Sequence, residues 1–173
     1  MTAGGWAQIE ALALRLTPAV VTLLLLVAGL VPLRLPYPVP VSPCLLLISV
    51  YFWALHRPSL MPAPVVFGLG TLGDLLGAAP LGAGTLVMVL VYCQTRAHRR
   101  LLLNSGFGMA WLAFAAVAAA AELMLWALAA LLAGALPDIR PAAFGALIAV
   151  LLYPIVAVLF LQAERLVARP AAR

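Results

Sequence analysis

Long apolar segments follow one another along almost the whole chain, separated only by short breaks that contain proline or arginine. A transmembrane helix needs about 20 mostly apolar residues to cross the hydrocarbon core of a bilayer. Of the 173 residues, 66% are hydrophobic and 9% are charged, whereas soluble domains carry about 25% charged residues. The chain is therefore predicted to be an all-α integral membrane protein. Residues 1–173 should form a single membrane domain, with no soluble domain on either side.

Six transmembrane helices are predicted from the positions of these breaks. The proline-rich stretch at residues 33–40 cannot remain helical, because proline removes a backbone donor and clashes with the preceding turn. Residues 104–136 are interpreted as one tilted helix, since two helices there would move the last three arginines across the membrane. Residues 6–16 either lie in the membrane interface or begin the first helix. The predicted spans are about residues 17–33, 41–55, 60–77, 81–94, 107–134 and 142–162.

The arginines predict the orientation of these spans. Eight of them fall in segments on one side of the membrane, and only Arg34 and Arg140 fall on the other side. Positively charged residues are enriched in cytoplasmic loops, so both termini are predicted to be cytoplasmic. The net charge of +5 is therefore attributed to the membrane edges, and no nucleic acid is expected as a partner. The predicted cytoplasmic basic edge consists of Arg57, Arg96, Arg99 and Arg100.

The segment at residues 67–82, FGLGTLGDLLGAAPLG, places Asp74 inside an apolar and glycine-rich sequence. A carboxylate within lipid costs roughly 2.5–3.5 kcal/mol, so Asp74 should face protein or water. The spacing of Gly73 and Gly77 is typical of closely packed membrane helices. We therefore expect a helix, a tight turn and a second helix, buried at the centre of the bundle. The residues expected to serve helix packing and the turn are Gly70, Gly73, Gly77, Pro80 and Gly82.

Asp74 and Glu122 are the only acids well inside the predicted spans. Each lies at a depth of about 22 Å from the cytoplasmic end of its span, so the two acids can share a level in the bundle. In one interpretation they form a proton or cation relay or a polar-ligand site. In the other they are structural and hydrogen-bond neighbouring helices or the turn backbone, with Arg34 or Arg140 as possible partners. The structural interpretation is favoured for both.

The sequence carries no recognisable catalytic or metal-binding pattern. Cys44 and Cys93 fit small apolar core residues better than metal ligands, and they lie near opposite membrane faces of the predicted topology. His56 and His98 lie at the membrane edge without a second ligand at useful spacing. No serine is accompanied by a histidine and an acid. We therefore expect no enzymatic activity, no metal and no cofactor.

Several of these segments resemble the rod shape-determining protein MreD family, and the resemblance covers about residues 40–161. The proline-rich stretch at residues 58–64 departs from the family pattern, which leaves the start of the third helix open. The segments that carry the resemblance are YFWALHRP at residues 51–58, the glycine-rich segment with Asp74 and Pro80, Tyr92, the glutamate of the fifth span, and Tyr153 with Pro154.

This resemblance implies a non-catalytic component of the bacterial cell-elongation complex in the inner membrane. Such a protein maintains cell shape by scaffolding peptidoglycan synthesis. Its implied partners are membrane lipid and an MreC-like protein and, through the latter, MreB filaments, a RodA-like glycosyltransferase and its transpeptidase. The implied fold resembles the small-molecule-binding membrane subunits of energy-coupling-factor transporters. The alternative is that the chain is itself such a transporter subunit, with Asp74 and Glu122 lining an outward polar pocket.

Overall fold

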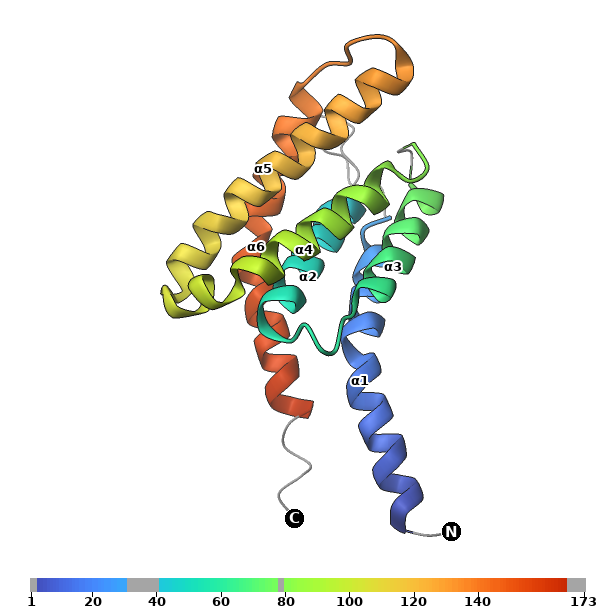
Figure 1. The fold of residues 1–173 in the computed structure, drawn as a ribbon, viewed down its shortest axis with the longest axis vertical. Coiled ribbons are helices and arrows are strands. Elements are labelled where there is room, and N and C mark those ends of the chain that lie inside the picture. Colours follow the sequence, from blue (N-terminus) through green and yellow to red (C-terminus); the bar gives the residue numbers. More distant parts are fainter. Residues whose placement is uncertain (1–2, 31–40, 78–79, 168–173) are drawn as a thin grey trace.

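The computed structural model describes the backbone of residues 3–30, 41–77 and 80–167, and the side chains of residues 16–30, 41–77 and 80–162. Within these ranges the chain forms six α-helices and no strand, which confirms the all-α prediction. Figure 1 shows how these helices are arranged. They are α1 (Ala3–Ala28), α2 (Val41–His56), α3 (Ala63–Leu76), α4 (Ala83–Asn104), α5 (Gly106–Ala133) and α6 (Arg140–Val167).

The core of the molecule is built around α2. This helix is apolar on every side, and such a helix is stable only when it is buried all round. Nearly every residue from Val41 to Leu55 is buried accordingly. Helices α1, α3, α4 and α6 all pack against α2. The other helices therefore each have one face toward this core and another face exposed. The expectation that the hairpin at residues 67–82 lies at the centre of the bundle is wrong, because α2 lies there and most residues of α3 are not buried.

Four of the remaining helices form two antiparallel pairs. Helix α3 packs chiefly against α4, and α5 packs against α6, while α4 also contacts α5. At one end of the molecule the α5–α6 pair extends beyond the other helices (Figure 1). Helix α1 begins and helix α6 ends at the opposite end (Figure 1). The end of α4, with three of the arginines, lies on that same side of the bundle as these helix ends.

Several predicted helix boundaries need correction. Helix α1 begins at Ala3, so residues 6–16 continue into the first helix and do not form a separate interfacial segment. Helix α3 begins only at Ala63, because Pro62 and Pro64 allow a helix to start but not to continue back through them. The prolines at residues 33–40 lie outside the described residues.

The largest error concerns α4, which continues to Asn104 instead of ending near residue 94. The sequence prediction equated the end of the apolar stretch with the end of the helix. Alanine, arginine and leucine are all good helix formers, so the helix continues through the basic cluster and presents the arginines on its last turns. The predicted limits of α2 and α5 agree with the structure within one or two residues.

Two helices are long and apolar enough to cross a membrane, namely α5 and the Arg140–Gln162 part of α6. Shorter apolar helices are formed by Leu16–Ala28, α2 and α3. With 28 residues, α5 is about 42 Å long, longer than the hydrocarbon core of about 30 Å. A helix of this length must tilt to match a bilayer, and Figure 1 shows α5 inclined to the long axis of the molecule.

Aromatic side chains join α2, α5 and α6. The rings of Tyr51 and Phe114 lie 5.0 Å apart, and those of Phe114 and Tyr153 lie 4.4 Å apart. All three side chains are almost fully buried. The Tyr51 hydroxyl donates a hydrogen bond of 2.8 Å to the carbonyl oxygen of Ala110, so its polar end is satisfied within the core. This cluster fixes the position of the α5–α6 pair against the central helix.

A proline inside α6 is matched by a tryptophan on α5. Pro154 has no backbone N–H, so the carbonyl oxygen of Val150 loses its partner within the helix. The indole Nε1 of Trp111 donates a hydrogen bond of 3.0 Å to that carbonyl oxygen. A side chain of one helix thus satisfies a backbone group that the neighbouring helix leaves free.

Candidate functional site

The best-defined polar site surrounds Asp74, in the last turn of α3. Its side chain is only 6% exposed. One carboxylate oxygen, Oδ2, accepts hydrogen bonds from the backbone N–H of Gly82 at 2.9 Å and from that of Thr85 at 3.0 Å. The same oxygen accepts a third hydrogen bond, at 2.8 Å, from the Thr85 hydroxyl. Asp74 therefore bridges α3 to the beginning of α4.

These donors are available because helix α4 lacks a cap of its own. The first N–H groups of any helix have no partner within the helix, and a side-chain oxygen at the N-cap usually accepts one of them. Here the N-cap residue is Gly82, which has no side chain and a φ of 89°, a conformation that favours glycine. Asp74 takes over the capping role from the neighbouring helix. Its negative charge also faces the positive end of the α4 dipole.

Glycines bring the two helices close enough for this contact. A Cβ placed on Gly70 would lie 2.9 Å from the Cα of Thr85, a distance that real Cβ atoms do not show. A Cβ on Gly84 would overlap Oδ1 of Asp74. A Cβ on Gly73 would meet Leu46 at 3.3 Å, a milder contact with a flexible side chain of α2. The backbones of α3 and α4 therefore come closest at Gly70, three residues before the Gly73 that the sequence spacing singled out.

The other predicted turn residues lie in the same region. The carbonyl oxygen of Pro80 accepts a hydrogen bond of 3.1 Å from the N–H of Ala83, which starts α4. Gly77 ends α3, and its N–H donates to the carbonyl oxygen of Gly73 at 2.9 Å. The structure thus brings Asp74 and the five predicted packing and turn residues together around one helical hairpin.

Asp74 also borders a small internal cavity of about 50 Å³. This volume has room for a few water molecules, whereas pockets for drug-sized ligands measure about 300–1,000 Å³. The cavity is lined mainly by glycines and apolar side chains, and Ser42 of α2 contributes a hydroxyl group. A shallow groove on the outer face of the α3–α4 pair is larger, but only Thr71 and Thr85 bring polar side chains to it.

Glu122 lies on α5 and is half-buried. It is close enough to Cys44, in the first turn of α2, for the two side chains to interact electrostatically. Ser42 of the same turn and Leu125 of α5 border the Asp74 cavity, whereas Glu122 itself does not line it. Among the described residues, neither acid forms an ion pair, and the exposed Arg140 does not reach them. Arg34 lies outside the described residues.

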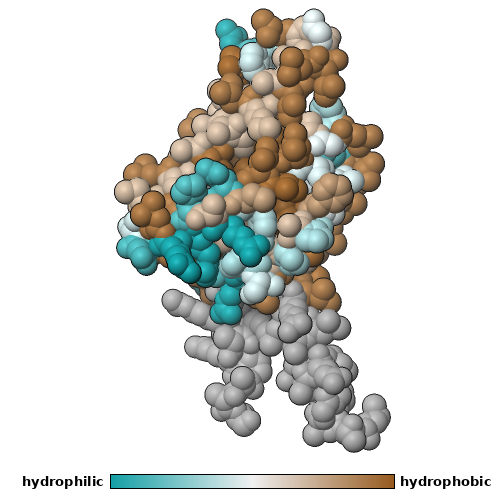
Figure 2. All heavy atoms as spheres, viewed as in Figure 1, coloured by the Kyte–Doolittle hydropathy of each residue, from teal (hydrophilic) through white to brown (hydrophobic). Residues whose placement is uncertain are grey.

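The basic edge is assembled from α4 and from the residues that follow α2. Arg99 donates hydrogen bonds to the carbonyl oxygens of Leu55 at 2.6 Å and His56 at 3.2 Å, so it caps the end of α2. Arg57, Arg96 and Arg100 remain exposed. Figure 2 shows hydrophilic residues gathered at this end of α4, against the mostly hydrophobic remainder of that face.

Comparison with known proteins adds nothing to this geometry. No protein-family model, curated protein or solved structure matches the chain. Within the part of the chain that the structure describes, no three His, Cys, Asp or Glu side chains are grouped so that they could hold a metal ion. The arrangement around Asp74 therefore has to be interpreted from its own contacts, which hold a helical hairpin together.

Sequence reasoning missed two contributors to these contacts, Thr85 and Gly84, and the contact of Trp111 with α6. Thr85 supplies two of the three donors to Asp74, and Gly84 provides the space for its other oxygen. Trp111 could have been found from Pro154, because a proline inside a helix always leaves one carbonyl oxygen without a partner. Thr85 and Gly84 carry no comparable signal, since they are ordinary small residues at the start of an apolar helix.

Proposed function

We propose that this protein is a multi-pass protein of the bacterial inner membrane that scaffolds the cell-elongation complex. In this proposal it is non-catalytic and maintains rod shape by holding peptidoglycan synthesis enzymes together, as its resemblance to the MreD family implies. The observation that carries the proposal is the way in which the Asp74 carboxylate is hydrogen-bonded and enclosed. Its carboxylate accepts three hydrogen bonds from the protein's own backbone and side chains, and it borders a cavity of only about 50 Å³.

The membrane part of the proposal is supported by the way backbone groups are satisfied. Helix α3 has 14 residues and is about 21 Å long. If α3 begins at the cytoplasmic edge, the turn after it lies within a hydrocarbon core of about 30 Å. Free backbone groups at that depth are tolerated only when protein groups satisfy them. Asp74 does this for α4, and Trp111 does it for α6.

We further propose six spans with both termini in the cytoplasm, in an arrangement like that of the energy-coupling-factor subunits. The basic edge lies at the same end of the bundle as the start of α1 and the end of α6. Reporter fusions that are active only in the cytoplasm should give signal at Arg100 and at Arg173, and none at Asp138. An inactive C-terminal fusion on a stably expressed protein would contradict this topology.

The scaffold is favoured over the transporter subunit by the apolar lining of both cavities and, beside Asp74, also by the small volume; the outer groove, at about 650 Å³, is excluded by its lining alone. A vitamin-sized ligand needs a pocket several times larger than the cavity beside Asp74, with convergent polar side chains. The outer groove offers mainly apolar side chains and two threonine hydroxyl groups. Asp74 lines the small cavity and Glu122 does not, so the two acids do not converge on it.

Affinity purification tests this proposal. The tagged full-length protein is extracted in mild detergent, and both the proteins and the small molecules that accompany it are identified. We expect an MreC-like protein, with a RodA-like glycosyltransferase and its transpeptidase recovered through it. A tagged membrane protein of similar length from the same cells serves as the control. Recovery of a vitamin-like ligand without these proteins would contradict the scaffold and support the transporter subunit.

A further inference from the structure

At the basic edge, some arginines have no acidic partner among the described residues. Arg99 is occupied by capping α2, whereas Arg96 and Arg100 are exposed and form no ion pair within the described part of the chain. None of the three acids whose side chains the structure describes lies at this edge. Asp74 and Glu122 lie inside the bundle, and Asp138 belongs to the loop before α6.

The contacts at this edge place Arg96 beside the segment that follows α2. Arg96 donates a hydrogen bond of 3.5 Å to the hydroxyl of Tyr92, and that hydroxyl donates at 3.5 Å to the carbonyl oxygen of Pro58. The guanidinium of Arg96 therefore lies beside the segment that contains Arg57. Arg96 and Arg100 are four residues apart on one helix, so their side chains share a face. Three positive charges thus gather around the last turns of α4.

Exposed apolar side chains follow these arginines along the chain. Leu101 is 67% exposed and Leu103 is 42% exposed in the final turn of α4, and Phe107 is 53% exposed at the start of α5. An occupant that fits this edge must therefore offer negative charge to the arginines and hydrocarbon to the neighbouring side chains. A soluble acidic segment would supply only the first.

We propose that this edge binds the phosphate headgroup of an anionic phospholipid, with the acyl chains lying against the leucines and Phe107. The guanidinium group suits this role, because its fixed donors match phosphate oxygens in a bidentate geometry. The inference relies on the membrane placement of the bundle but on no partner protein. Loss of lipid binding and loss of the elongation complex are therefore separate results.

The test uses the purified full-length protein in an uncharged detergent. Its thermal unfolding is followed while short-chain phosphatidylglycerol or phosphatidylcholine of the same chain length is added. We expect saturable stabilisation by phosphatidylglycerol that weakens at high salt, and much less stabilisation by phosphatidylcholine. In the Arg96→Gln, Arg100→Gln double variant the apparent Kd should rise about fivefold for each arginine, the equivalent of about 1 kcal/mol per charge.

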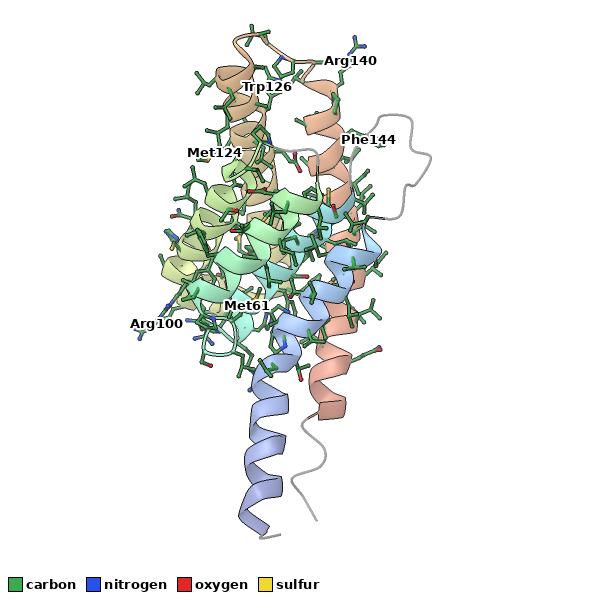
Figure 3. All side chains as sticks on the ribbon, turned by 90° about the vertical axis from the view of Figure 1, so that its right-hand side faces the viewer. Met61, Arg100, Met124, Trp126, Arg140 and Phe144 are labelled. Carbon is green, nitrogen blue, oxygen red and sulfur yellow. The ribbon has the colours of Figure 1, made fainter. Side chains whose placement is uncertain are left out.

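Arg140→Gln is the matched control, because Arg140 is also exposed but lies at the opposite end of the molecule from Arg100 (Figure 3). It should leave the lipid response unchanged. Arg100→Gln alone is a second variant, since Arg100 has no hydrogen bond to lose within the described residues. Equal stabilisation by the two lipids, or an equal loss in Arg140→Gln, would overturn the proposal. Stabilisation by inorganic phosphate or by a glutamate-rich peptide at the same concentrations would also overturn it, because the occupant would then be soluble.

Discussion

Asp74→Leu should severely destabilise the pairing of α3 with α4. The leucine cannot accept the hydrogen bonds that Gly82 and Thr85 now donate to the carboxylate. Each buried donor left without a partner costs about 1–3 kcal/mol, and two of the three are backbone groups that cannot turn away. Thr85 is only 4% exposed, so bulk water has little access to the two donors that it supplies. A loss of several kcal/mol would consume much of the stability of a typical domain, about 5–15 kcal/mol.

Asp74→Asn is the matched variant, because asparagine keeps the shape and one acceptor oxygen. It should retain most hydrogen bonds and lose mainly the attraction between the charge and the α4 dipole, about 0.3–1 kcal/mol and up to about 2 kcal/mol in partly buried geometries. Thermal unfolding in detergent should therefore rank the wild type first, asparagine second and leucine a distant third. Equal stability of the leucine variant and the wild type would show that Asp74 does not cap α4.

The same pair of variants separates the two interpretations of Asp74 in cells. If the protein maintains rod shape as proposed and Asp74 only holds the hairpin, the asparagine variant should preserve rod shape in a strain depleted of the native protein, and the leucine variant should not. If Asp74 carries a proton or a cation, asparagine should fail nearly as badly as leucine. Membrane levels of each variant are measured alongside cell shape. Round cells with a normally abundant asparagine variant would contradict the purely structural role.

The hairpin around Asp74 shows which features the sequence alone can predict and which it cannot. An acid among glycines in an apolar segment, followed by Pro80, predicts a helix, a turn and a second helix, and the structure has α3 and α4 in these places. The residue that meets Asp74 depends on the rotation of α4 relative to α3, which residues on both sides of the turn determine together. Local patterns do not contain that angle, so Thr85 was not predicted.

The end of a helix can be predicted where a residue such as proline is incompatible with helical backbone. It cannot be predicted from a change from apolar to charged residues, because both can be helical. Pro62 and Pro64 determine where α3 begins, although its start was predicted at residue 60, whereas the arginines near the end of α4 do not stop a helix. The central position of α2 is a related case. Its uniform apolar character predicts burial, but a helix that is apolar on every side gives no sign of which neighbour packs on which face.

Gly70→Ala should weaken the same hairpin from its other side. The added Cβ would lie 2.9 Å from the Cα of Thr85, and this neighbour is backbone that cannot rotate away. The helices must separate, and overpacking of this kind typically costs about 1–3 kcal/mol. Separation would also lengthen the hydrogen bonds from Thr85 to Asp74, so the cost should fall in the upper half of that range.

Gly68→Ala is the control that isolates this contact. Gly68 lies two residues earlier on α3, is exposed, and would place its Cβ with no other atom within 4 Å. Both variants gain the same helix propensity, about 1 kcal/mol for alanine over glycine, so the difference between them measures the contact alone. Thermal unfolding should show Gly68→Ala at or above the wild type and Gly70→Ala clearly below it. If both variants gained stability equally, α3 and α4 would not be in backbone contact at Gly70, and the distance that lets Asp74 reach the start of α4 would have to be set elsewhere.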